Sequence, residues 1–127
     1  MEILRIEWET GYMELSIKAF FPCNLQKARK IAPLINRYCT EEDRAYLLSE
    51  LHGMVEFYQE EIQRDKGVHE EVRRRYAAMG SMANPKRRDE MFYDYETRIR
   101  KNEALKKRVE RNIDCIERGE KNGKKKR

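Results

Sequence analysis

The chain has 127 residues, which is enough for one domain of ordinary size. Charged residues make up 40% of it and hydrophobic residues 39%, which is typical of a soluble, helix-rich chain with a thin core and excludes a membrane protein. The formal net charge is +5, from 28 Lys and Arg against 23 Asp and Glu. This balance excludes an acidic mimic of nucleic acid and weakly favours a polyanionic partner.

The N-terminal segment, residues 1–21, is predicted to form a β-hairpin. Leu4, Ile6 and Trp8 alternate with charged residues, which gives the period of two expected of a half-buried strand. Thr10-Gly11 is a turn signal. A second alternating set follows the turn: Met13, Leu15, Ile17 and Ala19. A two-stranded hairpin is marginal in water, so the helices that follow must cover its apolar face.

Helices are predicted over residues 24–79. Asn24 is a suitable N-cap for the first, and Pro33 is expected to kink or divide it. Thr40 begins a capping-box-like sequence that opens a longer helix. Lys66-Gly67 is interpreted as the end of that helix, so a separate short helix is expected from Val68 to Met79.

A long final helix is predicted over residues 85–118, after a loop over residues 80–85. Asn84 is its N-cap, Pro85 its first residue and Gly119 its terminator. Its apolar positions follow a heptad seam with two polar exceptions, Asn102 and Lys106. Because this helix is longer than the predicted Thr40–Lys66 helix, we expect it to overhang and to leave a seam free for a partner or a homodimer.

These elements predict one α+β domain over residues 1–118, with an N-terminal β-hairpin packed on helices and then a helical hairpin. Residues 119–127 are predicted to be a disordered basic tail. The three cysteines, Cys23, Cys39 and Cys115, fit neither a disulfide framework nor a zinc motif, and free thiols favour a cytoplasmic location. The chain opens without a signal peptide and has no apolar stretch of membrane-spanning length, so no membrane contact is expected.

The net charge is distributed asymmetrically along the chain. Residues 1–66 hold 9 basic and 12 acidic side chains, a net of −3, whereas residues 67–127 hold 19 basic and 11 acidic, a net of +8. The most concentrated part is six cations flanking the 80–85 loop: Arg73, Arg74, Arg75, Lys86, Arg87 and Arg88. Together with amide groups at a helix N-terminus, they predict an anion or nucleic-acid site. The alternative is a solvated face neutralised by Glu70, Glu71, Asp89 and Glu90.

Two further surfaces of the last helix are candidate contacts. Arg98, Lys101 and Arg108 lie close to one helical stripe, which could follow a phosphate backbone or be an ordinary solvent face. Met91 and Tyr93 point away from the seam and are candidate anchors for a protein partner. The alternatives are stacking on nucleic-acid bases, since basic residues stand nearby, and packing against the hairpin.

Motifs for chemistry are missing from the sequence, and we expect a protein that is not an enzyme and needs no cofactor or metal. His69-Glu70-Glu71-Val72-Arg73 begins like a zinc-protease helix, but Arg73 stands where the second histidine is required. In size, charge density and lack of catalytic motifs, the chain resembles the small accessory proteins of bacterial phages and mobile elements, such as anti-CRISPR inhibitors. This resemblance implies binding to a nucleic-acid-handling effector and assigns no role to individual residues.

The sequence therefore predicts a non-enzymatic protein that binds a nucleic acid, or a complex that handles nucleic acid, through a basic helical end. The alternative is a protein-interaction inhibitor of a bacterial defence effector that acts through its aromatic helical surface, or a helical scaffold or dimerisation module. The sequence is compatible with DNA, RNA or protein as the partner.

Overall fold

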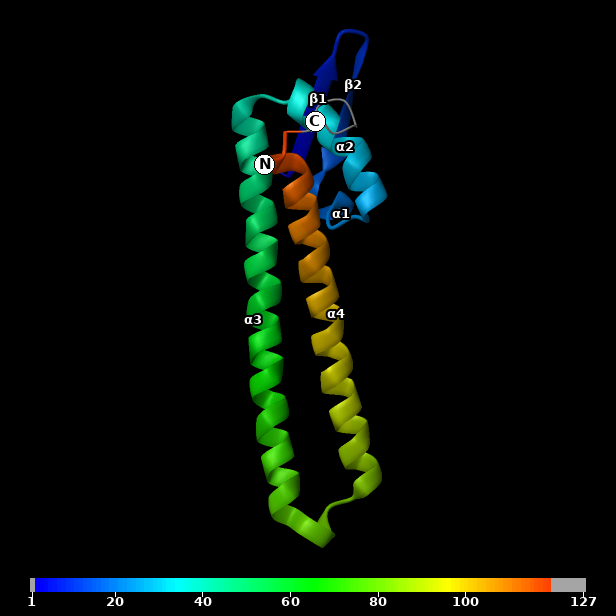
Figure 1. Cartoon of the computed structure of the whole chain (residues 1–127), viewed down its shortest axis with the longest axis vertical. Helices are drawn as coiled ribbons and strands as arrows, with labels where there is room; N and C mark the ends of the chain where they lie inside the picture. The colour runs from blue at the N-terminus through cyan, green and yellow to red at the C-terminus, as the bar shows by residue number, and fades with distance from the viewer. Residues whose placement is uncertain (1, 120–127) are drawn as a thin grey trace. The chain divides into compact units, whose positions relative to one another are not determined.

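A computed structural model describes residues 2–119 of the chain. It has the predicted α+β class, a two-stranded antiparallel hairpin followed by helices (Figure 1). The elements in chain order are β1 Ile3–Trp8, β2 Gly11–Ser16, α1 Ile17–Phe20, α2 Leu25–Tyr38, α3 Glu41–Met79, the 3₁₀ turn η1 Gly80–Met82 and α4 Pro85–Glu117. The predicted basic tail, apart from Gly119, lies outside the described residues.

The chain divides into two compact units. Unit 1 comprises Met1–Val55 and Lys107–Arg127, so it combines the hairpin with the C-terminal part of α4. Unit 2 is the continuous segment Glu56–Lys106, a helical hairpin. The single domain over residues 1–118 stays a prediction.

The β-hairpin of unit 1 is shorter than the sequence alternation predicts. In the register, Trp8 pairs with Gly11 and Ile3 pairs with Ser16, so the tight turn is Glu9-Thr10 and Gly11 already belongs to β2. Beyond the last ladder pair, the amide of Ile17 still donates to the carbonyl of Glu2 at 3.0 Å. The chain then leaves the sheet as α1, so the expected strand positions Ile17 and Ala19 are helical.

The core of unit 1 is apolar and well buried. Leu4, Ile6 and Leu15 from the hairpin are buried, together with Ile31 and Ile35 of α2. Asn24 caps α2 as predicted, since its side chain accepts a hydrogen bond of 2.8 Å from the amide of Lys27. Pro33 is buried within α2, which continues past it to Tyr38, so the proline does not divide the helix.

A buried asparagine joins the two sequence-distant parts of unit 1. The Nδ2 of Asn112 donates to the carbonyl of Cys23 and its Oδ1 accepts from the amide of Cys23, both at 2.9 Å. Asn112 is only 1% exposed. Cys23, whose backbone Asn112 contacts, is itself buried, and this burial raises the pKa of its thiol to about 11. All three cysteines of the chain are free thiols.

The long helix α3 corrects the predicted helix boundary at Lys66-Gly67. α3 begins after Thr40, whose Oγ1 accepts from the amide of Asp43 at 3.1 Å, and runs unbroken to Met79. Gly67 lies inside this helix and has no unusual backbone angle, whereas Gly80, just after Met79, has φ +58°. The left-handed glycine that ends the helix is therefore Gly80.

The relative lengths of the two long helices are also opposite to the prediction. α3 has 39 residues and α4 has 33. The expected overhang of the final helix was inferred from a shorter α3, so that argument for a free seam is wrong. No helix in the described part of the chain is long and apolar enough to cross a membrane.

Unit 2 holds the C-terminal part of α3 and the N-terminal part of α4, which run side by side in antiparallel order (Figure 1). Cross-helix contacts are spaced along it, from Lys66 Nζ to Glu103 Oε2 at 3.6 Å to the rings of Tyr76 and Phe92, whose centroids are 6.0 Å apart. Within residues 56–106 the only buried side chains are Ile62, Asp65 and His69. The interior of unit 2 is therefore thin, with half-buried aromatic residues in place of a deep aliphatic core.

Candidate nucleic-acid interface

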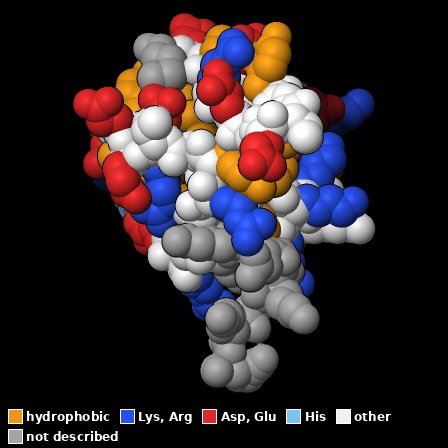
Figure 2. All heavy atoms as spheres, turned by 90° about the horizontal axis from the view of Figure 1, so that it is seen from above, with side chains coloured by type: hydrophobic (Ala, Val, Ile, Leu, Met, Phe, Trp, Pro, Cys, Tyr) orange, Lys and Arg blue, Asp and Glu red, His pale blue; other side chains and the backbone are white. Residues whose placement is uncertain are grey.

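Surface charge of both signs is mixed over much of the protein. In unit 1, Arg5 lies within 2.6 Å of Glu7 and 3.3 Å of Glu14, and Arg118 lies 3.1 Å from Asp114. Figure 2 shows one face of the molecule, on which basic, acidic and hydrophobic side chains are interspersed. Such surfaces favour solubility and are poor candidates for a polyanion site.

The segment that connects α3 to α4 has a different charge pattern. From Arg73 to Arg88 the sequence holds six basic residues and no acidic residue. All six belong to unit 2, and the turn between the helices brings the two triplets to its loop end. We call this set the loop-end cations: Arg73, Arg74, Arg75, Lys86, Arg87 and Arg88.

The N-terminus of α4 is capped by its own sequence. The Oδ1 of Asn84 accepts from the amides of Lys86 at 3.1 Å and Arg87 at 3.2 Å, which confirms the predicted cap. Pro85 contributes no amide hydrogen. The helix amides that were expected to assist anion binding therefore already have an acceptor, so any anion site at this end depends on the side chains.

The loop-end cations fall into two groups by their ion pairs. Arg74 and Arg75 both contact Glu71, at 2.9 and 3.2 Å, and Arg88 contacts Asp89 at 3.1 Å. Among the residues that the structure describes, no ion-pair partner is found for the other three, Arg73, Lys86 and Arg87. The predicted neutralisation by nearby acids thus applies to half of the set.

A hollow of about 360 Å³ lies between the two helices at this end of unit 2. We call it the Tyr76–Phe92 hollow. It is lined by Arg73, Tyr76, Ala77, Arg88, Asp89 and Phe92. Its volume is close to the lower end of the range for small-molecule sites, about 300 to 1,000 Å³, so it fits one ring system better than a peptide segment.

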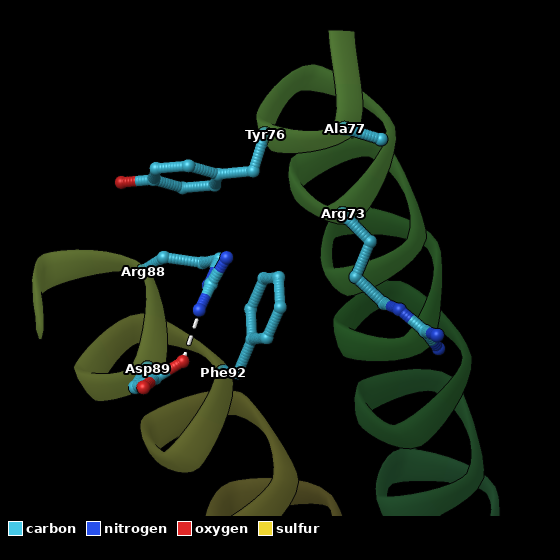
Figure 3. Close-up of a pocket in the computed structure, with 6 residues that line it drawn as sticks. All are labelled: Arg73, Tyr76, Ala77, Arg88, Asp89 and Phe92. Carbon is cyan, nitrogen blue, oxygen red and sulfur yellow. Dashed lines mark hydrogen bonds and ion pairs between the residues drawn. The ribbon is translucent and has the colours of Figure 1, made fainter. Parts of the chain in front are cut away.

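The side chains of the hollow separate aromatic surface from charge (Figure 3). The Tyr76 and Phe92 rings are almost perpendicular, at 89°, and the Tyr76 hydroxyl donates to Met91 Sδ at 3.4 Å. The Arg88 side chain extends toward the two rings and meets Asp89, whereas the Arg73 guanidinium points away from them (Figure 3). The floor of the hollow is therefore aromatic and nearly neutral. Arg73, which has no ion-pair partner among residues 2–119, lies at its margin.

The predicted basic stripe of the last helix consists of Arg98, Lys101 and Arg108, and these residues have different surroundings. The Nη1 of Arg98 lies 3.6 Å from Asp65 Oδ1, and its guanidinium lies 5.2 Å from the centre of the Tyr95 ring. Lys101 is exposed in unit 2, and Arg108 is exposed in unit 1. Arg98 is therefore exposed but contacts Asp65 and the Tyr95 ring within unit 2, and the three predicted residues belong to two different units.

The predicted protein-contact residues also differ from one another. Tyr93 is 65% exposed, whereas Met91 is half-buried and receives the Tyr76 hydrogen bond. Met91 thus contributes to the inner packing of unit 2. Tyr93 remains available to an external partner.

A buried polar cluster in unit 2 was missed at the sequence level. Asp65 and His69 are one helical turn apart on α3, and His69 packs against the Phe92 ring at 5.3 Å and the Tyr95 ring at 6.0 Å. Its Nε2 lies 3.6 Å from Glu96. The signal in the sequence was the spacing of four between two polar residues on the apolar stripe of α3. Among the described residues no group of His, Cys, Asp and Glu could hold a metal ion.

Comparisons with protein-family models, curated proteins and solved structures gave no match to this chain.

Proposed function

We propose that this protein is a non-enzymatic nucleic-acid-binding protein that acts through the loop end of unit 2. The observation that carries the proposal is the arrangement of the loop-end cations around an aromatic hollow. Six basic side chains without an intervening acid provide an electrostatic attraction for phosphates, and three of them lack an ion pair among the described residues.

The aromatic residues make nucleic acid a better candidate than a simple anion. Phosphate or sulfate requires only positive charge and donors, whereas Tyr76 and Phe92 supply ring surface next to that charge. Nucleic-acid sites that do not read sequence combine these two features, a basic track for the backbone and aromatic rings for the bases. The effector-binding role implied by the resemblance to phage accessory proteins would use the same surface if that effector carries nucleic acid.

The test is the salt dependence of binding to a short labelled oligonucleotide. Each phosphate contact on a single strand contributes about 0.7 to the slope of log K against log salt. We expect a slope between about −2, for the three cations without an ion pair, and about −4, for all six. Fluorescence anisotropy between about 50 and 200 mM salt measures it. A slope near zero, or no binding at about 50 mM salt, would contradict the proposal.

A second candidate function is inhibition or scaffolding of a protein partner. The observation that favours it is Tyr93, a large aromatic side chain that is 65% exposed on α4. Tyrosine is enriched among the residues that dominate protein interfaces. Failure of the oligonucleotide titration would make this the leading function.

A further inference from the structure

We infer that the Tyr76–Phe92 hollow accepts one unpaired base of a single-stranded nucleic acid, so the protein prefers single strands to duplex. This inference rests on the proposed function and specifies its substrate class. The loop-end cations would hold the phosphates on either side of that base.

The ring geometry supplies a stacking surface. Tyr76 and Phe92 meet edge to face, so each ring keeps at least one face that the other does not cover. The Phe92 ring also packs against His69, at a centroid distance of 5.3 Å. Among the described residues, Phe92 thus contacts two rings and Tyr76 contacts one, and the hydrogen bond from Tyr76 to Met91 Sδ helps to hold Tyr76 in place.

The charge of the hollow fits a neutral base better than a phosphate. Asp89 lines the hollow and would repel a phosphate placed within it. Its ion pair with Arg88, at 3.1 Å, leaves little net charge next to the rings, while Arg73 points away from them (Figure 3). A nucleotide matches this arrangement, because its neutral aromatic base can face the rings while its anionic phosphate stays outside the hollow, near the cations.

The preference for single strands follows from access to the base. In a duplex both faces of each base are covered by its neighbours, so an aromatic side chain cannot stack without disrupting the helix. Unpaired bases present their faces freely, and stacking on an aromatic side chain tolerates any base. Duplex can still contact the loop-end cations, but it forfeits the stacking contribution.

The experiment compares three fluorescein-labelled probes of equal length with the full chain: a single strand, its duplex, and a strand of abasic sites that keeps the phosphates. We expect the single strand to bind roughly 5- to 100-fold more tightly than the abasic strand, the range set by stacking of one base, and also more tightly than duplex. The abasic probe requires no change in the protein, so misfolding cannot explain a difference.

Variants of the ring then assign the effect to the hollow. Tyr76→Leu should lower affinity for the single strand roughly 5- to 100-fold and leave the abasic strand unchanged, whereas Tyr76→Phe, which keeps the ring, should bind nearly as wild type. Tyr58→Leu removes another half-buried tyrosine of α3 that does not line the hollow, and it should have no effect. Helicity by circular dichroism verifies that each variant folds.

The outcomes separate the two proposals. Equal affinity for all three probes, with steep salt dependence, would overturn the base site and retain nucleic-acid binding. Loss of binding with Tyr58→Leu equal to that with Tyr76→Leu would also overturn the base site. Absence of binding to every probe at low salt would overturn the proposed function itself.

Discussion

Asn112 shows how one buried polar side chain can define the packing of a small unit. Its amide makes two hydrogen bonds of 2.9 Å with the backbone of Cys23, 89 residues away in sequence. A leucine of similar size would leave the amide and the carbonyl of Cys23 without these partners in a buried site. An unpaired buried polar group costs about 1 to 3 kcal/mol.

Because two such groups lose their partners, we expect Asn112→Leu to lower the free energy of unfolding by about 2 to 6 kcal/mol. The matched control is Arg111→Leu, because Arg111 is the exposed neighbour on the same helix and its replacement should change stability by less than about 0.5 kcal/mol. Urea denaturation followed by circular dichroism measures both. Equal stability of the two variants would show that the Asn112 contacts do not hold unit 1 together.

At the scale of elements, the C-terminal end of α3 is determined by which of two glycines, Gly67 or Gly80, has a left-handed backbone. Gly67 lies in the middle of the helix, and a Cβ added there would meet nothing within 4 Å. Gly80 has φ +58°, a conformation that disfavours any L side chain. The two glycines should therefore respond to the same substitution in opposite directions.

Gly67→Ala is expected to stabilise the protein by about 0.5 to 1 kcal/mol, because glycine inside a helix loses more backbone entropy than alanine. Gly80→Ala should destabilise it by about 1 kcal/mol. Midpoints of chemical denaturation compare the two variants directly. If Gly67→Ala is the destabilising change, α3 ends at Gly67 as the sequence pattern first indicated.

The elements that the sequence predicted correctly are those with local signals. Asn24, Thr40 and Asn84 each accept a hydrogen bond from an amide in the first turn of the helix they precede. The errors arise where a local signal competes with tertiary structure. Gly67 resembles a helix end by residue type, yet packing of α3 against α4 in unit 2 compensates for its low helix propensity.

The candidate site was also predicted only in part, because its cations are a local signal in the sequence whereas its hollow depends on tertiary structure. Six cations flanking a loop are visible in the sequence, because a turn between two helices brings neighbouring triplets to one end. Their division into paired and unpaired side chains depends on rotamers and on contacts with Glu71 and Asp89, which spacing alone does not determine. The hollow required Tyr76 and Phe92 to meet across two helices, which depends on the register of the helical hairpin.

At the scale of the whole molecule, the net charge of +5 does not show how the charge is distributed, because residues 73–88 hold six basic residues and no acidic residue. Two triple variants with the same net charge can distinguish the effect of where the cations lie from the effect of the total charge. Arg73, Lys86 and Arg87 lie at the loop end of unit 2, while Lys18, Arg29 and Lys30 are exposed in unit 1. Replacing either triplet by glutamate changes the net charge by −6, from +5 to −1.

The most direct measurement is the affinity of these two triple variants for one labelled single strand across a salt series. We expect the loop-end variant, Arg73→Glu with Lys86→Glu and Arg87→Glu, to show a salt slope smaller in magnitude by about 2 and to lose most of its affinity. The unit 1 variant, Lys18→Glu with Arg29→Glu and Lys30→Glu, should keep the wild-type slope. Equal losses in the two variants, or no loss in either, would contradict a nucleic-acid site at the loop end.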